Sequence, residues 1–311
     1  MGSHPQIESA EHASFLTTRS RNSELWFVNN EKLERAVLGY LAKYAETREA
    51  TLYAFAIEGN HNQSPARFPK ENRADFMRDF NSSVARTVPR YCPKHKGGQF
   101  WHRRYSAEFL PGAEDIEEYF FYTVLQPVQD GLVERISDYP GYNCFHDAVH
   151  GIEREYEVLD IKAFNAARKR DKAAPLKDFI KTHTLRYARL PGYEHLTQQE
   201  YSKLMHRKLE ERRLEIVKRR RAQGKGFLGR DALLRTLPGA RPKNTKTSKR
   251  GERRPRVLSV CNQRRAHCRE WYYAKQNAYR EASARYRAGD LSVEFPHGMY
   301  KPYIRTQPPP E

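Results

Sequence analysis

An imidazole and an amide stand two residues apart in the stretch Glu58-Gly-Asn-His-Asn-Gln-Ser-Pro, which follows an apolar, strand-like run. In extended backbone, alternate side chains point to opposite faces, so His61 and Gln63 share one face and Asn62 points to the other. An imidazole nitrogen and an amide oxygen in this arrangement can bind one cation. The alternative is a histidine that is hydrogen-bonded within a loop, and this stretch taken alone favours that alternative.

A phenol and a second amide stand four residues apart in a helical stretch, residues 117–128. Tyr122 and Gln126 are about 40° apart around a helix of 3.6 residues per turn, so they lie on one side of it. The apolar residues cover a different arc: Ile116, Phe120, Phe121 and Val124. The helix can therefore bury one side and present the phenol and the amide at its edge, with Pro127 expected to distort the last turn. The alternative for Tyr122 is an ordinary half-buried aromatic residue.

Six segments must position these side chains. Periodicity and capping residues predict a strand at 14–18, a helix capped by Asn30, a strand at 52–57, a helix at 72–88 ended by Pro89, an extended aromatic-rich segment at 99–110, and a helix at 114–126. The order of these segments, with connections of varied length, favours an α+β fold in which an antiparallel sheet carries helices on one face.

Length and cysteine content give the broad class. A chain of 311 residues can hold one large domain or two ordinary ones. We expect a flexible tail at 1–13, a folded domain at 14–150 and a basic accessory region at 151–311. The four cysteines match neither a zinc ribbon nor a disulfide framework. No window approaches the roughly 18 apolar residues of a membrane span. These features predict a soluble protein of the cytoplasm.

Positive charge is concentrated in the second half of the chain. Residues 1–150 contain 17 Lys and Arg against 20 Asp and Glu, whereas residues 151–311 contain 39 against 18. A near-neutral domain joined to a strongly basic region is typical of a protein that meets a polyanion, most simply nucleic acid. The alternative is a solvated basic surface without a partner.

Two groups of basic residues are candidates for phosphate contacts. Arg103 and Arg104 stand in the aromatic segment and could lie beside Tyr122, with ordinary surface charge as the alternative. The larger group stands in the basic half: Lys218, Arg219, Arg220, Arg221, Lys225, Arg230 and Arg241.

The basic half is predicted to be mostly helical over 152–222, extended over 224–256 and helical again over about 262–288. The last helix carries three tyrosines at seven-residue spacing, so they fall near one face: Tyr272, Tyr279 and Tyr286. They either pack in a core or stack on nucleic-acid bases, and packing in a core is the favoured alternative.

Three motifs, taken in order, resemble those of the REP-associated tyrosine transposases, which are single-tyrosine members of the HUH endonuclease superfamily. They are His61-Asn-Gln63 after a strand, Phe100-Trp-His-Arg-Arg-Tyr105, and Tyr122-Thr-Val-Leu-Gln-Pro-Val128 running into Gly131-Leu-Val133 and Asp138-Tyr-Pro140. The family pattern is Asn-His-hydrophobic-His at a strand end, a Trp-containing strand, and Tyr-x-x-x-Asn-Pro-Val on a helix. The resemblance covers residues 14–145 and implies a ferredoxin-like or RRM-like sheet.

The resemblance implies a role for each matching residue. Tyr122 would be the nucleophile, and His61, Gln63 and Gln126 would hold Mg²⁺ or Mn²⁺. The chain departs from the pattern at Gln63, where the family has a second histidine, and at Asn62, where it has a hydrophobic residue. A site of one histidine and two amides is neutral, so we expect it to bind the metal loosely, with help from a substrate phosphate.

The activity implied is metal-dependent cleavage and rejoining of single-stranded DNA through a 5′-phosphotyrosine, at hairpins of extragenic palindromic repeats. The implied location is the bacterial cytoplasm, at the nucleoid when DNA is bound. Two alternatives stay open. The altered metal positions allow a catalytically weak relative that binds structured DNA without cutting it, and the basic half allows an RNA-binding protein.

Overall fold

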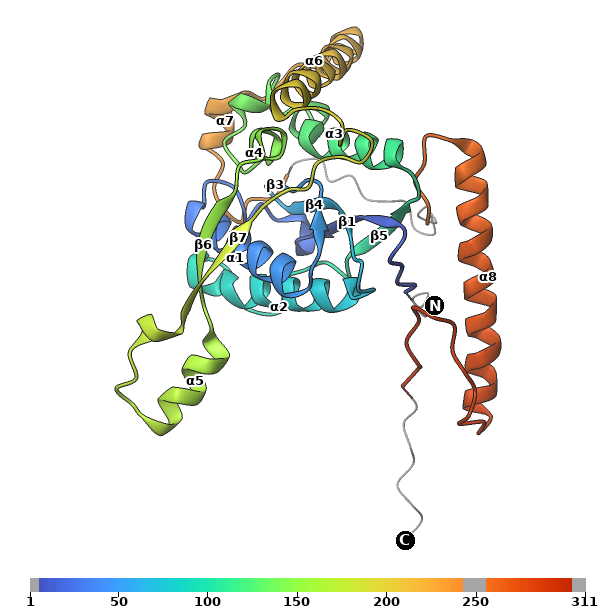
Figure 1. Ribbon diagram of the computed structural model, residues 1–311. Coiled ribbons are helices and arrows are strands. Elements are labelled where there is room, and N and C mark those ends of the chain that lie inside the picture. Colours follow the sequence, from blue (N-terminus) through green and yellow to red (C-terminus); the bar gives the residue numbers. More distant parts are fainter. Residues whose placement is uncertain (1–5, 243–255, 304–311) are drawn as a thin grey trace.

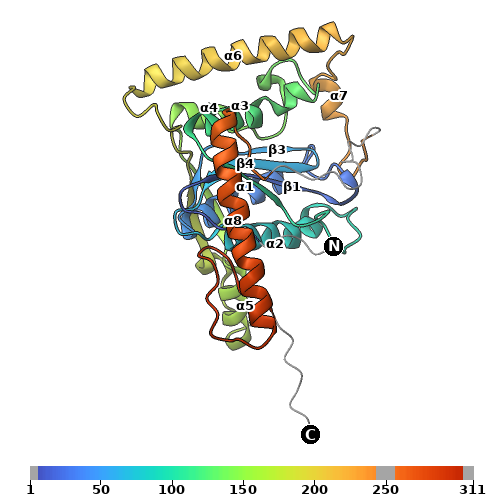
Figure 2. The same cartoon turned by 90° about the vertical axis from the view of Figure 1, so that its right-hand side faces the viewer.

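A five-stranded antiparallel sheet forms the centre of the structure, a computed structural model that describes residues 6–242 and 256–303 (Figure 1, Figure 2). Its strands are β1 (Ala13–Arg19), β2 (Thr51–Leu52), β3 (Ala56–Glu58), β4 (His61–Arg67) and β5 (Ser106–Leu110). Their order is β2-β4-β1-β5, and β3 also pairs with β4. Since β2 and β3 pair along the same edge of β4, the strand predicted at 52–57 exists in interrupted form.

The His61 stretch is a tight hairpin and not an exit from the sheet. β3 ends at Glu58, Gly59 and Asn60 form the turn, and His61 begins β4 directly opposite Glu58. β4 pairs on both edges and is central despite its polar sequence. The turn is closely packed, because a Cβ at Gly59 would lie 2.8 Å from Cδ2 of Leu25.

Helices cover both faces of the sheet. α1 (Glu31–Thr47) and α2 (Arg73–Tyr91) pack together on one face, and α3 (Ala113–Gln129) crosses the other (Figure 1). Asn81 of α2 donates a hydrogen bond to Thr18 of β1 (3.4 Å), whereas the ring of Phe15 lies 4.8 Å from that of Tyr119 of α3. The predicted α+β class with an antiparallel sheet is confirmed, whereas the prediction that the helices lie on one face is wrong, because α3 covers the second face. α3 lies opposite α1 and α2 because β1 is buried on both of its sides.

Helix starts follow the capping residues more closely than helix ends follow the prolines. Oδ1 of Asn30 accepts a hydrogen bond from the Leu33 N–H (3.1 Å) at the start of α1, which confirms the predicted cap. Pro89 lies inside α2 and Pro127 inside α3, and each helix continues for two residues beyond its proline. The prediction that Pro89 ends its helix is wrong, because a proline in the last turn removes only one hydrogen-bond donor.

The second half of the chain begins with an arm. After α4 (Phe145–His150), β6 (Arg154–Leu159) and β7 (Ile180–Leu185) form an antiparallel pair whose connection carries α5 (Ile161–Arg170) away from the body (Figure 1). The prediction of a mostly helical segment over 152–222 is therefore wrong in its first part. Side chains of β6 alternate in burial as those of a strand do, so the pattern was present in the sequence.

Three further helices follow the arm. They are α6 (Gln198–Ala222), which crosses α3 and α4, α7 (Arg230–Leu234), and α8 (Asn262–Arg287), which runs beside the β5 edge of the sheet (Figure 2). Short 3-10 turns lie at Arg21–Ser23 (η1), Ile136–Asp138 (η2) and Leu176–Phe179 (η3). None of the described helices is long and apolar enough to cross a membrane.

Two hydrophobic clusters hold these elements together. The larger one surrounds the sheet and includes Leu185, Tyr201 and Ile216, so it crosses the boundary predicted at 150/151. The smaller one forms where α8 packs on Phe109 of β5. Tyr272 is buried in the smaller cluster, as a core residue would be.

The other two tyrosines of α8 also pack against protein. Tyr279 and Tyr286 both contact Phe295, with ring centroids 5.5 and 5.6 Å apart. The segment predicted to be extended over 224–256 contains α7, and its residues 243–255 lie outside the described residues.

Candidate active site

Strand pairing places four polar side chains on the face of the sheet that α3 covers. His61 lies opposite Arg19 of β1 and opposite Glu58 of β3. Directly paired residues share a face, and Gln63 shares it too because it follows His61 by two residues along β4. The sequence predictions for His61 and Gln63 thus converge on the surface beneath α3.

Tyr122 lies on α3 above this surface and is half-buried. Its ring meets that of Phe15 edge-on, with 5.6 Å between centroids. The Gln126 side chain, one helical turn further on, lies near enough to the Tyr122 hydroxyl to lower its pKa. The phenol and the amide therefore meet on one side of the helix, facing the sheet.

Charged groups around Tyr122 act on its hydroxyl. Burial raises the pKa of Tyr122 above its ordinary value, and the negative charges of Asp130 and Glu58 raise it further. The Gln126 side chain and the positive charge of Arg19 act in the opposite direction and do not outweigh these effects. The phenol is therefore protonated at neutral pH, and it lies within electrostatic reach of both a carboxylate and a guanidinium.

His61 is buried and is oriented from both sides of its ring. Nδ1 lies 2.8 Å from Oδ1 of Asn60, an oxygen that can accept a hydrogen bond from Nδ1–H. Nε2 lies 3.8 Å from Oε2 of Glu58, and the side chains of His61 and Glu58 are only 7% and 5% exposed. Glu58 was missed in the sequence, although a position directly across a two-residue turn from His61 was a signal that could have found it.

Two buried amide atoms in this region have no hydrogen-bond partner within the described residues: Nε2 of Gln63 and Oε1 of Gln126. An unpaired buried polar atom costs about 1–3 kcal/mol, so a bound group is the natural partner for each. Oε1 of Gln126 suits a cation. As oriented, Nε2 of Gln63 is a donor that suits a phosphate oxygen, and a half-turn of its amide would present a ligating oxygen instead.

This set of donors fits a hard divalent cation. His61, Glu58 and Gln126 offer an imidazole nitrogen, a carboxylate and an amide oxygen, which together suit Mg²⁺ or Mn²⁺. In the part of the chain that the structure describes, no group of three or more His, Cys, Asp and Glu side chains could hold a metal ion. A metal site here would therefore depend on the amide of Gln126.

Arg103 and Arg104 lie on the other side of the sheet from Tyr122, and not beside it. Both are exposed in the loop before β5. They line a pocket with residues of α2, among them Met77, and with Tyr300. Since α2 covers the face opposite α3, the two arginines cannot reach across the sheet, and their position corrects the expectation drawn from the sequence.

Arg220, in the basic cluster at the end of α6, connects this helix to the end of α3 and to the loop that follows α6. Its Nη1 donates to the carbonyl of Gln129 (3.0 Å) and its Nη2 to the carbonyl of Gly226 (2.8 Å). The guanidinium also lies 5.0 Å from the ring centroid of Phe227. These contacts correct the prediction of a phosphate contact for Arg220, because both of its terminal nitrogens already donate to protein carbonyls and the residue is half-buried.

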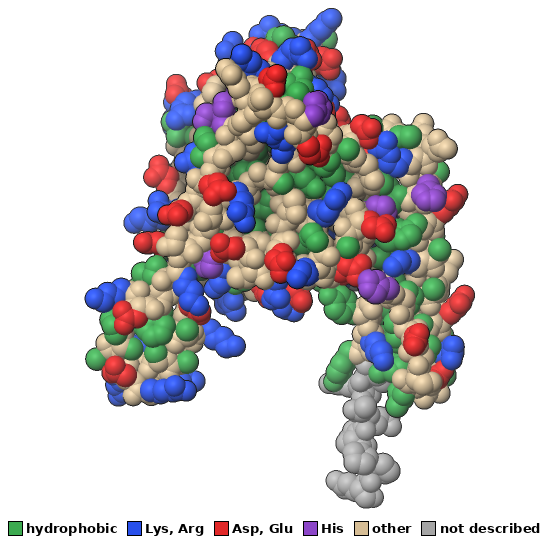
Figure 3. All heavy atoms as spheres, viewed as in Figure 1, with side chains coloured by type: hydrophobic (Ala, Val, Ile, Leu, Met, Phe, Trp, Pro, Cys, Tyr) green, Lys and Arg blue, Asp and Glu red, His purple; other side chains and the backbone are tan. Residues whose placement is uncertain are grey.

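The rest of the cluster divides into paired and unpaired side chains. The paired members are Arg221 with Glu134 (3.0 Å), Arg230 with the carbonyl of Asp138 (3.4 Å), Arg241 with Glu24 (2.8 Å) and Lys225 with Gln223 (2.9 Å). Lys218 and Arg219 are exposed and have no polar partner among the described residues. Figure 3 shows Lys and Arg side chains gathered at the top of the molecule, over α6.

Part of the positive charge of α6 faces the acidic side of α3. Arg212 donates to Glu118 (2.5 Å) and lies 4.6 Å from the ring centroid of Phe121, and Lys208 donates to Glu117 (2.7 Å). These pairs hold α6 on the helix that carries Tyr122, an arrangement that the sequence did not predict.

Comparisons with known proteins find a likeness among solved structures alone. No protein-family model and no curated protein matches the chain. Among solved structures, the chain is similar to one described as the REP-associated tyrosine transposase bound to a REP hairpin, with 17% sequence identity and a TM-score of 0.40. That likeness covers 47% of this chain and 84% of the other.

Proposed function

We propose that this protein cleaves and rejoins single-stranded DNA, with Tyr122 as the nucleophile. The observation that carries the proposal is the meeting of Tyr122 and Gln126 on α3 with His61 and Glu58 on the sheet beneath, beside Arg19. The order of motifs in the sequence and the unpaired cations of α6 support DNA as the substrate, probed most directly as a hairpin.

The proposed reaction transfers a phosphoryl group without loss of bond energy. The Tyr122 oxygen attacks the scissile phosphorus, the bond from phosphorus to the 3′ oxygen breaks, and the phenol proton ends on the released 3′-hydroxyl. The product is a 5′-phosphotyrosine, which keeps the phosphodiester energy available for rejoining. Arg19 stabilises the charge that builds up on the phosphate oxygens, and Gln126 orients the phenol.

A divalent cation would add electrostatic stabilisation to this site. Bound by His61, Glu58 and Gln126, Mg²⁺ or Mn²⁺ would supply Lewis-acid stabilisation of the scissile phosphate. Nε2 of Gln63, unpaired in the protein, is placed on the same face to donate to a phosphate oxygen.

The test is a covalent-adduct assay with labelled hairpin DNA and Mn²⁺. The wild-type protein should form a protein–DNA adduct that survives denaturation, and Tyr122→Phe should form none. Tyr119→Phe is the matched control, because Tyr119 is also a half-buried phenol of α3 and contacts both Phe15 and Tyr122. An adduct that persists in Tyr122→Phe, or is lost only in Tyr119→Phe, would refute the choice of nucleophile.

A second candidate is a protein that binds structured DNA without cutting it. It is favoured by the amide at Gln63, which presents a donor where an imidazole would ligate, and by the raised pKa of the Tyr122 phenol. Under this candidate, Gln63→His should create or strengthen adduct formation. Binding to RNA instead of DNA would appear as a higher affinity for the matching RNA hairpin at the same salt concentration.

A further inference from the structure

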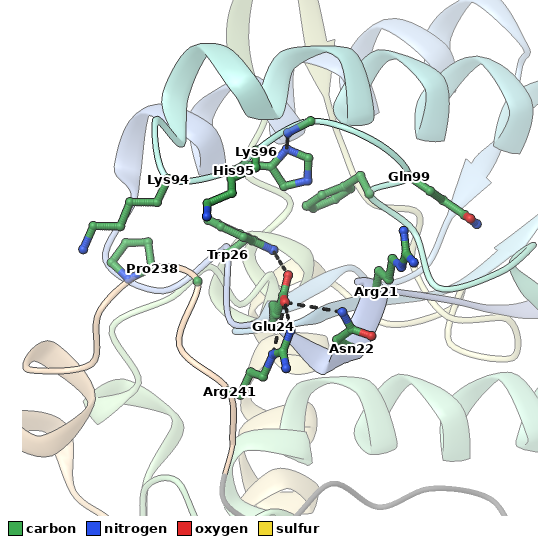
Figure 4. Close-up of a pocket in the computed structure, with 13 residues that line it drawn as sticks. Arg21, Asn22, Glu24, Trp26, Lys94, His95, Lys96, Gln99, Pro238 and Arg241 are labelled. Atoms are coloured by element: carbon green, nitrogen blue, oxygen red, sulfur yellow. Dashed lines mark hydrogen bonds and ion pairs between the residues drawn. The ribbon is translucent and has the colours of Figure 1, made fainter.

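A pocket of about 550 Å³ lies at the end of β1, beyond the candidate active site (Figure 4). Three segments that are distant in sequence line it: residues 21–26, residues 94–100 and residues 238–241. The third segment is tied to the first, because Leu25 N donates to Ala240 O (2.8 Å) and Gly239 N donates to Leu25 O (3.0 Å). The volume is within the range of roughly 300–1,000 Å³ that is typical of ligand sites.

The rim of the pocket is positively charged. Arg21, Lys94 and Lys96 are exposed, and their side chains have no polar partner among the described residues. Figure 4 shows Lys94 and Arg21 at opposite sides of the opening. Arg241 also lines the pocket, where it is paired with Glu24 at 2.8 Å. Three unpaired cations around one opening suit an anionic group such as a phosphate.

The inner wall is aromatic and holds one carboxylate. The rings of Trp26 and Phe100 are buried, and the ring of His95 lies 5.2 and 5.8 Å from theirs. Oε2 of Glu24 accepts a hydrogen bond from the Trp26 indole N–H (3.1 Å), whereas Arg241 donates to Oε1 (Figure 4). A carboxylate oxygen can accept a second hydrogen bond, so Oε2 can still receive one from an amino group on a planar ring.

Hydrogen bonds of Asn60 connect the segment beside the pocket with His61 of the candidate active site. Asn60 donates through Nδ2 to the carbonyl of Ser23 in η1 (3.1 Å), and its Oδ1 lies 2.8 Å from Nδ1 of His61. Ser20 N also donates to the Asn60 carbonyl (2.8 Å). Asn22 and Ser23 have φ of 56° and 55°, a left-handed conformation that costs energy in residues other than glycine. The turn that orients His61 therefore also holds η1 in this conformation.

We propose that this pocket binds one unpaired nucleotide of the DNA strand that enters the active site, with its phosphate at the cationic rim and its base against the aromatic wall. The inference rests on the proposed function and adds a substrate feature to it: a single-stranded extension next to the hairpin. A base with an exocyclic amino group, such as cytosine, donates to Glu24, and thymine cannot.

The test compares the binding of two hairpins, one blunt and one with a single-stranded extension of four cytosines. Both are bound to the full-length Tyr122→Phe protein, because this variant cannot trap the DNA as a covalent adduct. The double variant Lys94→Ala/Lys96→Ala should bind the extended hairpin about tenfold more weakly. The slope of the logarithm of the association constant against the logarithm of salt concentration should fall in magnitude by about 1.4, because each of the two lost phosphate contacts to a single strand accounts for about 0.7. Its affinity for the blunt hairpin should change by less than about twofold. The matched control, Lys162→Ala/Lys177→Ala, removes the same charge from the α5 arm.

Two results would overturn the rim part of the proposal. One is a loss on the extended hairpin no greater than that of the arm control. The other is an equal loss on both hairpins, which would indicate general attraction of DNA without a nucleotide site. Failure of the full-length protein to bind either hairpin would overturn the whole proposal, including the part that concerns the base.

The base is tested separately by changing the extension. Stacking is worth about fivefold or more per base, so an abasic extension should bind at least that much more weakly than cytosine. Cytosine should also be preferred over thymine, and Glu24→Gln should remove this preference. Arg241→Ala keeps the carboxylate and should keep the preference, which controls for loss of the ion pair. Equal binding of cytosine and thymine by the protein with Glu24 intact would refute the role of Glu24.

Adduct formation in the protein with an intact Tyr122 separates this inference from the proposed function. If no adduct forms but Lys94→Ala/Lys96→Ala selectively weakens binding of the extended hairpin, the nucleotide pocket is supported and the proposed cleavage activity is refuted. If the adduct forms as fast in Lys94→Ala/Lys96→Ala as in the wild-type protein at a limiting concentration of the extended hairpin, the cleavage activity is supported and the nucleotide pocket is refuted.

Discussion

Arg220 and Arg219 are adjacent arginines of α6 for which the structure predicts opposite effects on replacement by alanine. Arg220 is half-buried and donates to the carbonyls of Gln129 and Gly226. Arg219 is exposed and has no polar partner among the described residues. Each replacement removes one positive charge from the same helix, so the pair separates a packing role from a charge role.

The magnitude for Arg220→Ala follows from its contacts. Two hydrogen bonds from a charged donor are worth about 1.5 kcal/mol each at the low end of their range. The contact with Phe227 adds about 0.5–1 kcal/mol at a partly exposed site. Nε of Arg220 is buried without a partner, and removing it returns about 1 kcal/mol. The expected loss in the free energy of unfolding is therefore about 2–3 kcal/mol, whereas Arg219→Ala should stay within about 0.5 kcal/mol.

Denaturant unfolding of both variants measures this difference directly. Arg220→Lys should recover little of the loss, because an ammonium cannot reach both carbonyls with the geometry of a guanidinium. Hairpin binding should show the reverse order: Arg219→Ala should lower the salt slope by about 0.7–0.9, and Arg220→Ala should leave it unchanged under conditions where the variant is folded. Equal stabilities of the two alanine variants would refute the role given to Arg220.

Two further predictions concern ionisable groups of the core and the candidate site. Glu58→Gln should lower the pKa of Tyr122, because burial, Asp130 and the Glu58 carboxylate all raise it. The pKa is measured from the phenolate absorbance, after subtraction of the absorbance of a variant that also carries Tyr122→Phe. A rise in the pKa of Tyr122 would contradict the placement of Glu58. The pKa of Tyr139 is raised well above its ordinary value by burial, so its contribution to stability is complete below the unfolded pKa of about 10 and is lost as the pH rises toward the folded pKa. The melting temperature should therefore fall above about pH 10, less steeply in Tyr139→Phe, and an identical slope in that variant would show that another group controls alkaline unfolding.

Helical periodicity carried most of what could be predicted. It located α1 and its Asn30 cap, and it placed Tyr122 and Gln126 on one side of α3, because an i,i+4 pair on a helix depends only on local geometry. Strand pairing is not local. β4 begins with His61-Asn-Gln63, a polar sequence with no apolar alternation, and its central place depends on β1, about 45 residues earlier in the chain. Glu58 was missed for a different reason: its closeness to His61 is local, but it depends on the two-residue turn between them, which the sequence analysis did not identify.

The basic half shows why net charge alone could not predict its role. Arg220 packs over Phe227, and a Cβ at Gly131, where φ is +76°, would overlap its guanidinium. Arg221 is paired with Glu134 at 3.0 Å, so two adjacent arginines of the cluster fasten α6 and the loop after it to the end of α3. A count of Lys and Arg treats such side chains as available to a nucleic acid, although they already contact groups of the protein. The cations that remain for phosphate are those without carboxylate or carbonyl partners, such as Arg219, and they can be identified only once the packing of α6 is known.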